Sequence, residues 1–137
     1  MNFSFREKSL WLMLIGLVVI FTFYFATVLP SNATNVEPQH MATFALAALI
    51  LAIVAVVGHI VIAIVDRRTA TDERDRLIEL KGKRNANYVL VTGVFLALCI
   101  PLLTKGTFLL THVLLGFWVL AQLVEIGSQL FLLRQGA

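Results

Sequence analysis

The chain has few of the residues on which soluble and secreted proteins rely. Its 137 residues include one cysteine and three prolines, and only 14% are Asp, Glu, Lys or Arg. A lone thiol, Cys99, cannot close an intrachain disulfide, which excludes a disulfide-stapled fold and a dithiol redox centre. Soluble domains carry about 25% charged residues, so this composition is not that of a soluble domain.

Motifs that carry catalysis are also missing. The sequence contains no Gly-rich phosphate loop and no Ser, His and acidic set at a spacing typical of nucleophilic catalysis. No Cys, His and carboxylate cluster recurs at helical spacing, which argues against zinc. His59 and His112 fall in apolar segments at depths about 10 Å apart, so a bis-histidine haem is a minor alternative. His40 is expected to be solvated. We expect no enzyme, no catalytic residues, no metal and no cofactor.

Long apolar runs are what the chain has in abundance, since 59% of its residues are hydrophobic. Four runs cover about 10–29, 41–65, 88–103 and 107–133. At 1.5 Å per residue each run is long enough, or in the third nearly long enough, to cross a hydrocarbon layer of ~30 Å. Lipid cannot satisfy free backbone groups, so crossing segments are expected to be helical. The first run is longer than the core of a signal peptide and is expected to be retained. The predicted fold is an all-α, four-helix transmembrane bundle of two hairpins, a single integral membrane domain over 1–137.

Basic residues are distributed unevenly. They gather at the N-terminus, between residues 66 and 87 and near the C-terminus, with Lys105 as the exception. Short loops rich in Lys and Arg stay in the cytoplasm, so both termini and the 66–87 segment are predicted to be cytoplasmic. The same residues suit an anionic leaflet. The lipid bilayer is therefore the expected partner of these charges, and direct nucleic-acid binding is not expected.

The segment 66–87 is the only substantial polar stretch. Thr71 is a predicted N-cap, with Asp72 and Glu73 in the first turn, where the helix dipole favours anions. A short amphipathic helix would follow, and Gly82 is expected to loosen its join to the third span. This segment has two interpretations: a solvated connector with internal ion pairs, or a surface that meets a partner.

Two stretches carry a resemblance to known proteins, "DERDRLIELKG" at 72–82 and "FREKSLW" at 5–11. The chain resembles a group of small bacterial inner-membrane proteins with four spans and an acidic-Arg run between spans two and three. Some of these are encoded beside a helix-turn-helix regulator. The resemblance implies a multi-pass protein of the bacterial inner membrane, with a sensing or sequestering role and a transcriptional regulator as partner. It supplies no catalytic residues. The candidate partner-binding loop consists of Asp72, Glu73, Arg74, Asp75 and Arg76.

Glu125 is an acid inside the apolar run at 107–133. A charged carboxylate facing mid-bilayer lipid costs at least ~2.5–3.5 kcal/mol, so Glu125 is expected to face other helices. Gln122 and Gln129 share its helical stripe, and His59 is the predicted partner on the second span. Two interpretations stay open for this polar site: a hydrogen bond that holds the bundle or an oligomer together, and a protonatable transport site.

Small residues predict where the helices pack. Alanines recur at spacings of three and four in the second span, and two glycines flank the polar stripe of the fourth. The candidate packing residues are Ala45, Ala48, Ala52, Ala55, Gly116 and Gly127. Four short helices bury little surface, so a homo-oligomer is also expected.

These observations favour a small integral membrane protein with a regulatory or partner-binding role through its cytoplasmic loop. The alternative is a homo-oligomeric small-solute or proton-coupled transporter that uses Glu125 and His59. Small multidrug exporters have a similar size and span number, but they keep an essential acid in the first span. The first span has none here, which lowers the transporter alternative.

Overall fold

The computed structural model describes residues 4–65 and 73–135, which form four long helices. They are α1 (Phe5–Val28), α2 (Pro38–Val65), α3 (Glu73–Leu103) and α4 (Phe108–Gln135), with a short 3₁₀ turn, η1 (Leu29–Ser31), after α1. The described residues contain no strand. Each of the four helices is long and apolar enough to cross a membrane. The predicted all-α bundle is therefore confirmed.

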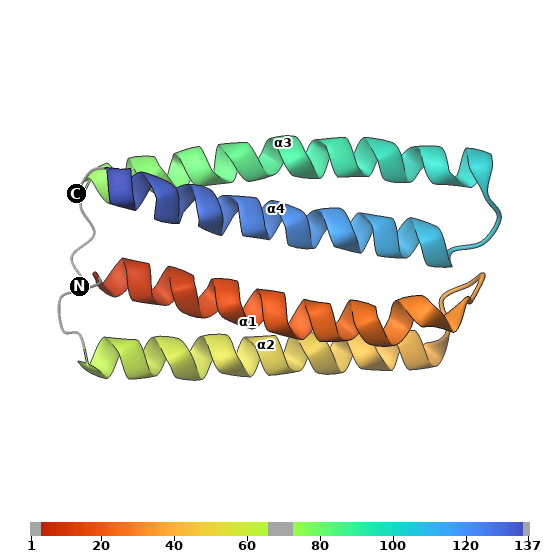
Figure 1. Cartoon of the computed structure of the whole chain (residues 1–137), viewed down its shortest axis with the longest axis horizontal. Helices are drawn as coiled ribbons and strands as arrows, with labels where there is room; N and C mark the ends of the chain where they lie inside the picture. The colour runs from red at the N-terminus through yellow and green to blue at the C-terminus, as the bar shows by residue number, and fades with distance from the viewer. Residues whose placement is uncertain (1–3, 66–72, 136–137) are drawn as a thin grey trace.

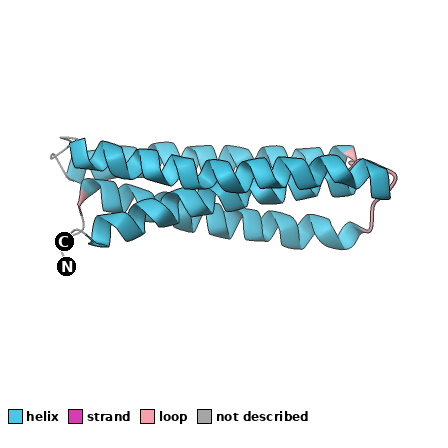
Figure 2. Ribbon diagram, turned by 90° about the horizontal axis from the view of Figure 1, so that it is seen from above, coloured by secondary structure: helices cyan, strands magenta, loops and turns pink. Residues whose placement is uncertain are grey.

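The helices form two hairpins that lie side by side (Figures 1 and 2). Helix α1 packs on α2 and α3 packs on α4, while contact between α1 and α4 joins the hairpins. Helix α1 thus separates α2 from α4 along most of the bundle (Figure 1). We call the end where α1 and α3 begin the charged end. The opposite end, with the connections at 29–37 and 104–107, is the loop end.

Local signals set the helix ends. Ser4 caps α1, because its Oγ accepts the backbone N–H of Glu7 at 3.2 Å. At the loop end, Asn32 has a φ of 49° and Gly106 a φ of 99°. A Cβ at Gly106 would lie 2.2 Å from the carbonyl oxygen of Thr34. Only glycine fits there, and the tight turn lets the two connections touch.

The two connections are hydrogen-bonded to each other. The Phe108 N–H donates to the carbonyl of Thr34 at 3.2 Å, and the Val36 N–H donates to Oγ1 of Thr107 at 3.1 Å. Asn35 accepts the Thr107 N–H at 3.2 Å. These bonds hold the loop ends of the two hairpins in register.

Helix α3 begins 15 residues before the start of its predicted span and runs through Gly82 without interruption. The expectation that Gly82 loosens a join was wrong. A Cβ at Gly82 would lie 2.7 Å from Cγ of Gln129 and 2.9 Å from the carbonyl oxygen of Glu125. Gly82 therefore serves close packing between α3 and α4, and the charged segment is part of the spanning helix. We call residues 73–87 the α3 extension. The predicted N-cap, Thr71, lies outside the described residues.

The predicted packing glycines were wrong. No atom of the described residues lies within 4 Å of a Cβ built on Gly127, and among the same residues a Cβ on Gly116 meets only Cζ of Phe25 at 4.0 Å. The close approach is at Gly93, where a Cβ would lie 2.2 Å from Cβ of Phe117. Because lipid-facing and helix-facing surfaces are both apolar, sequence spacing alone did not separate them.

The prediction that α2 packs through the alanines at positions 45, 48, 52 and 55 was only partly right. Ala45 and Ala52 are exposed, while Ala48 and Ala55 are half-buried at the edge of the contact. Since α2 packs along its length on α1 alone among the described helices, its contact stripe is narrow. Ala47 and Leu51 lie in that stripe against the cluster that surrounds Phe21 of α1.

Candidate functional site

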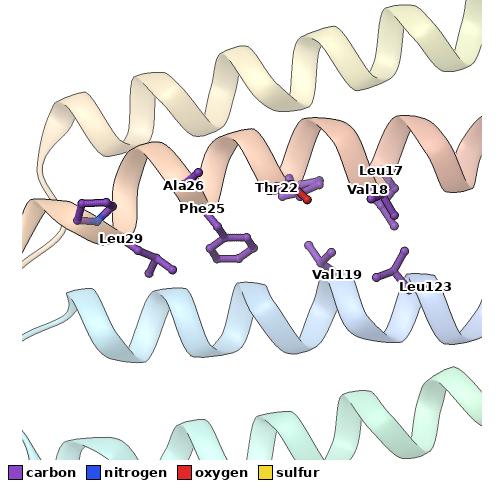
Figure 3. A pocket seen from close by; sticks show the side chains of 10 residues that line it. Leu17, Val18, Thr22, Phe25, Ala26, Leu29, Val119 and Leu123 are labelled. Carbon is purple, nitrogen blue, oxygen red and sulfur yellow. The ribbon is translucent and has the colours of Figure 1, made fainter.

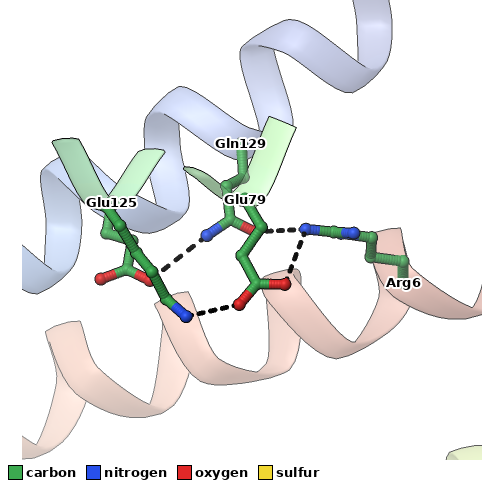
Figure 4. Close-up of polar contacts among 5 residues, drawn as sticks. Arg6, Glu79, Glu125 and Gln129 are labelled. Carbon is green, nitrogen blue, oxygen red and sulfur yellow. Dashed lines mark hydrogen bonds and ion pairs between the residues drawn. The ribbon is translucent and has the colours of Figure 1, made fainter. Parts of the chain in front are cut away.

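The charged end holds a network of five side chains, which we call the polar layer (Figure 4). Arg6 of α1 donates to Oε1 of Gln129 at 3.0 Å and lies 3.8 Å from a carboxylate oxygen of Glu79. Gln129 donates through Nε2 to Glu125 at 3.4 Å, and Lys83 pairs with Glu79 one helical turn away. Lys83 also interacts electrostatically with Glu125. Three helices therefore meet through alternating positive, negative and amide groups.

The pairing of α3 with α4 decides the surroundings of Glu125. Its carbonyl oxygen lies against Gly82, and the neighbouring Asn85 donates to Ser128 Oγ at 3.1 Å. Gly82 precedes the apolar part of α3, which starts at Tyr88, by six residues or about 9 Å. Glu125 thus lies beside the charged extension of α3, close to Lys83.

The predicted contact between Glu125 and His59 was wrong. His59 donates through Nδ1 to the carbonyl of Ala55 at 2.6 Å, and its Nε2 is 2.6 Å from Oγ of Ser9 on α1. Helix α1 stands between α2 and α4, so the imidazole meets α1 first. Gln129 hydrogen-bonds Glu125 in the polar layer, as predicted, while Gln122 is half-buried about two turns before Gln129 on α4.

Arg6, Glu79 and Lys83 were missed by sequence reasoning. Each looked like an ordinary charge of a helix end, and the i, i+4 spacing of Glu79 and Lys83 was the one local signal of pairing. Arg6 and Gln129 are separated by 123 positions. Only the packing of one hairpin against the other brings them together.

A second contact fastens α4 to α1 at the same end. Arg134 donates through Nε to Glu7 at 3.3 Å, and its guanidinium lies 5.6 Å from the ring centroid of Trp11. A cation over an indole face is stabilising by about 0.5–1 kcal/mol at exposed sites. The end of α4 is thereby held beside the start of α1.

The candidate partner-binding loop is the beginning of α3. Asp72 lies outside the described residues. Glu73, Arg74 and Arg76 are exposed in the first turns, and Asp75 is half-buried. Leu77 is exposed as well, at 59%. The α3 extension therefore shows both charge and apolar surface on its outward side.

Two pockets lie nearer the loop end. The first, about 480 Å³, lies between α1 and α4 (Figure 3) and has one polar lining residue, Thr22. Its described lining contains no titratable side chain. Its lining is Leu17, Val18, Phe21, Thr22, Phe25, Ala26, Leu29, Pro30, Val119 and Leu123.

The second pocket, which we call the histidine pocket, has a volume of about 410 Å³ and is lined by α1, α2, α4 and the loops beside them. His40 and His112 both line it, with ring centroids 6.3 Å apart. The expectation that His40 is solvated was wrong, because it is only 5% exposed and its ring packs edge-on against Phe108. Its place in the first turn of α2 turns the ring inward.

The two imidazoles of this pocket differ in their hydrogen bonding. His112 donates through Nδ1 to the Phe108 carbonyl at 2.8 Å, so its Nε2 accepts the Tyr24 hydroxyl at 3.0 Å. Nδ1 of His40 accepts the Glu37 N–H at 3.1 Å, which leaves the proton of the neutral ring on Nε2. That Nε2 is buried without a hydrogen-bond partner among the described residues. An unmade bond of this kind costs about 1–3 kcal/mol.

The chain matches no protein-family model, no curated protein and no solved structure.

Proposed function

We propose that this protein is a membrane-embedded regulatory protein that binds a cytoplasmic partner through the outward face of the α3 extension. The observation that carries the proposal is the continuity of α3 from Glu73 to Leu103. A flexible connector would have to be ordered on binding, whereas this surface belongs to a helix already held in the bundle. Preorganisation of this kind lowers the cost of association.

Contacts on the inner side of the extension hold it in place. Ile78 is buried, Glu79 pairs with Arg6 of α1, and Gly82 is pressed against α4. The outer side then has a fixed direction. Because these contacts join α3 to both α1 and α4, a partner on the outer side would also sense how the two hairpins are arranged.

The outer side has the composition of an interaction surface. Leu77 and Leu80 are 59% and 54% exposed and lie among basic side chains. Apolar residues together with arginine are typical of the centres of protein interfaces. The exposed basic residues are Arg74, Arg76, Lys81, Lys83 and Arg84. A partner with an acidic surface fits this charge, and a transcriptional regulator is the partner that the resemblance implies.

A homo-oligomer in the bacterial inner membrane is part of the proposal. Helix α2 leaves most of its surface uncovered within one chain, including Ala45 and Ala52. Cysteines placed at these positions in a Cys99→Ser background are expected to form disulfide-linked dimers in membranes. Absence of such dimers, with efficient labelling of both cysteines, would argue for a monomer.

The transport alternative has less support. It needs Glu125 to be a proton-binding group inside the apolar layer, and Glu125 instead lies beside Lys83 and Gln129 near the charged end. A carboxylate hydrogen-bonded within its own helix and close to a lysine supports a structural role in the polar layer better than a transport role.

Site-specific photo-crosslinking tests the partner proposal. A photoreactive amino acid at Leu77 should give an adduct with one discrete cytoplasmic protein in living cells. Leu98 is the matched control, because it is on the same helix, is 68% exposed and belongs to the apolar span. The Leu77 adduct should disappear when Arg74 and Arg76 are both changed to Glu. Adducts with lipid alone at Leu77, or an adduct that survives the charge reversal, would contradict the proposal.

A further inference from the structure

Among the described residues, the lining of the histidine pocket includes one buried hydrogen-bond donor without a partner. His112 and His59 each use both ring nitrogens, because each donates to the carbonyl one turn earlier and accepts a hydroxyl. His40 accepts at Nδ1 from the backbone of Glu37 and keeps an N–H at Nε2 with nothing to receive it. Among the described residues that line the pocket, His40 therefore holds the one buried donor that lacks an acceptor.

The pocket walls select the kind of molecule that can supply that acceptor. The lining formed by the described residues contains no Asp, Glu, Lys or Arg, so no side chain in it balances the charge of an anion or a cation. Tyr24 and Phe44 contribute aromatic walls and lie with ring centroids 6.0 Å apart. Rings pack well against other flat rings. A neutral, flat molecule with a carbonyl oxygen fits both features.

The open side of the pocket faces the surface that lipid would cover. Met41 and Phe44 of α2 line the pocket and are 64% and 37% exposed. Helices α2 and α4 do not pack along each other, which leaves a lateral opening between them. His112 is four residues from the first residue of α4, about 6 Å along the helix. A ligand held here would have its polar head near the loop end and its tail in the apolar layer.

We propose that the histidine pocket binds a lipid-soluble quinone, with one quinone carbonyl accepting the Nε2–H of His40. A quinone is neutral, flat and membrane-soluble, and it carries the missing acceptor. An acyl ester of a phospholipid also offers a carbonyl, but it lacks the flat ring for which the aromatic walls are suited. The site is at the opposite end of the bundle from the α3 extension, so it is independent of the proposed partner surface.

Binding of decylubiquinone to the purified full-length protein in detergent tests the proposal. We expect saturable binding of about one quinone per chain, weakened about tenfold in His40→Phe, because one hydrogen bond is lost. His40→Gln restores an N–H donor and should recover part of the affinity. His59→Phe removes a histidine far from the pocket and should leave binding unchanged.

Two measurements on the unmodified protein keep the test independent of variant folding. Decylbenzene has a flat ring and the same chain without a carbonyl, and it should bind about tenfold more weakly than the quinone. The ¹⁵N and ¹H resonances of His40 Nε2–H should shift on addition of decylubiquinone and not on addition of decylbenzene. Equal binding of the two compounds, or no shift at Nε2, would overturn the proposal. Displacement of the quinone by lower concentrations of diacylglycerol would identify an ester-lipid site and would overturn it too.

Discussion

The substitution Gly93→Ala tests the packing that sets the register of α3 and α4. A Cβ at this position would lie 2.2 Å from Cβ and 2.3 Å from Cγ of Phe117. Carbon atoms in contact are separated by about 3.5–4.0 Å. Rotation of the Phe117 side chain cannot move its own Cβ, so the helices must separate here by roughly 1.5 Å.

The magnitude follows from two opposing effects. Overpacking of a tight contact costs about 1–3 kcal/mol, while alanine favours a helix over glycine by up to about 1 kcal/mol. Because two carbon atoms overlap severely here, the overpacking cost should lie in the upper part of this range, so a net loss of about 1–2 kcal/mol is expected in the free energy of unfolding. Gly127→Ala is the matched control, because its new Cβ would meet nothing within 4 Å. That variant should be neutral or more stable by up to about 1 kcal/mol.

Equilibrium unfolding in mixed micelles with increasing SDS measures both variants. Far-UV circular dichroism follows the helices, and the fluorescence of the two tryptophans, Trp11 on α1 and Trp118 on α4, follows the bundle. The reasoning is refuted if Gly93→Ala unfolds at the same SDS fraction as the unmodified protein. It is equally refuted if Gly127→Ala is destabilised as much as Gly93→Ala, since the effect would then not depend on Phe117.

Three further predictions concern the charged end. Arg6→Ala should destabilise the bundle by about 1–3 kcal/mol in the same SDS titration, because the hydrogen bond to Gln129 and the Glu79 ion pair are lost. Lys81→Ala on the exposed face is the control and should change stability by less than about 0.5 kcal/mol. A double-mutant cycle of Ser9→Ala and His59→Phe should give a coupling of about 0.6 kcal/mol, the average of interhelical hydrogen bonds in membranes; zero coupling would show that the contact is not formed. Glu125→Gln should lower the free energy of unfolding by less than about 1 kcal/mol. The amide can still accept the hydrogen bond from Gln129, and only a partly screened attraction to Lys83 is lost. Failure of this variant to assemble would show that the charge of Glu125 is essential to the bundle.

The sequence by itself determined the class of fold and the number of helices. Apolar runs of sufficient length, broken by Pro30, Pro38 and the polar stretch before Tyr88, leave helices as the only way to satisfy the backbone in lipid. These signals are local and depend on length and composition, so they can be read without knowing which helices pack against one another. The same composition does not fix the end of a helix inside charged sequence, which is why α3 begins at Glu73 and not near Tyr88.

Only the tertiary structure decided which residues face one another. In a soluble helix the apolar stripe marks the buried face, but these helices are apolar nearly all round, so the pattern did not distinguish Gly93 from Gly127 or Ala47 from Ala45. The sequence also did not determine which polar side chains contact one another. The order of helices across the bundle places His59 beside Ser9 and leaves Glu125 with Gln129 and Lys83. These pairings depend on contacts between residues far apart in the chain, which local sequence patterns do not specify.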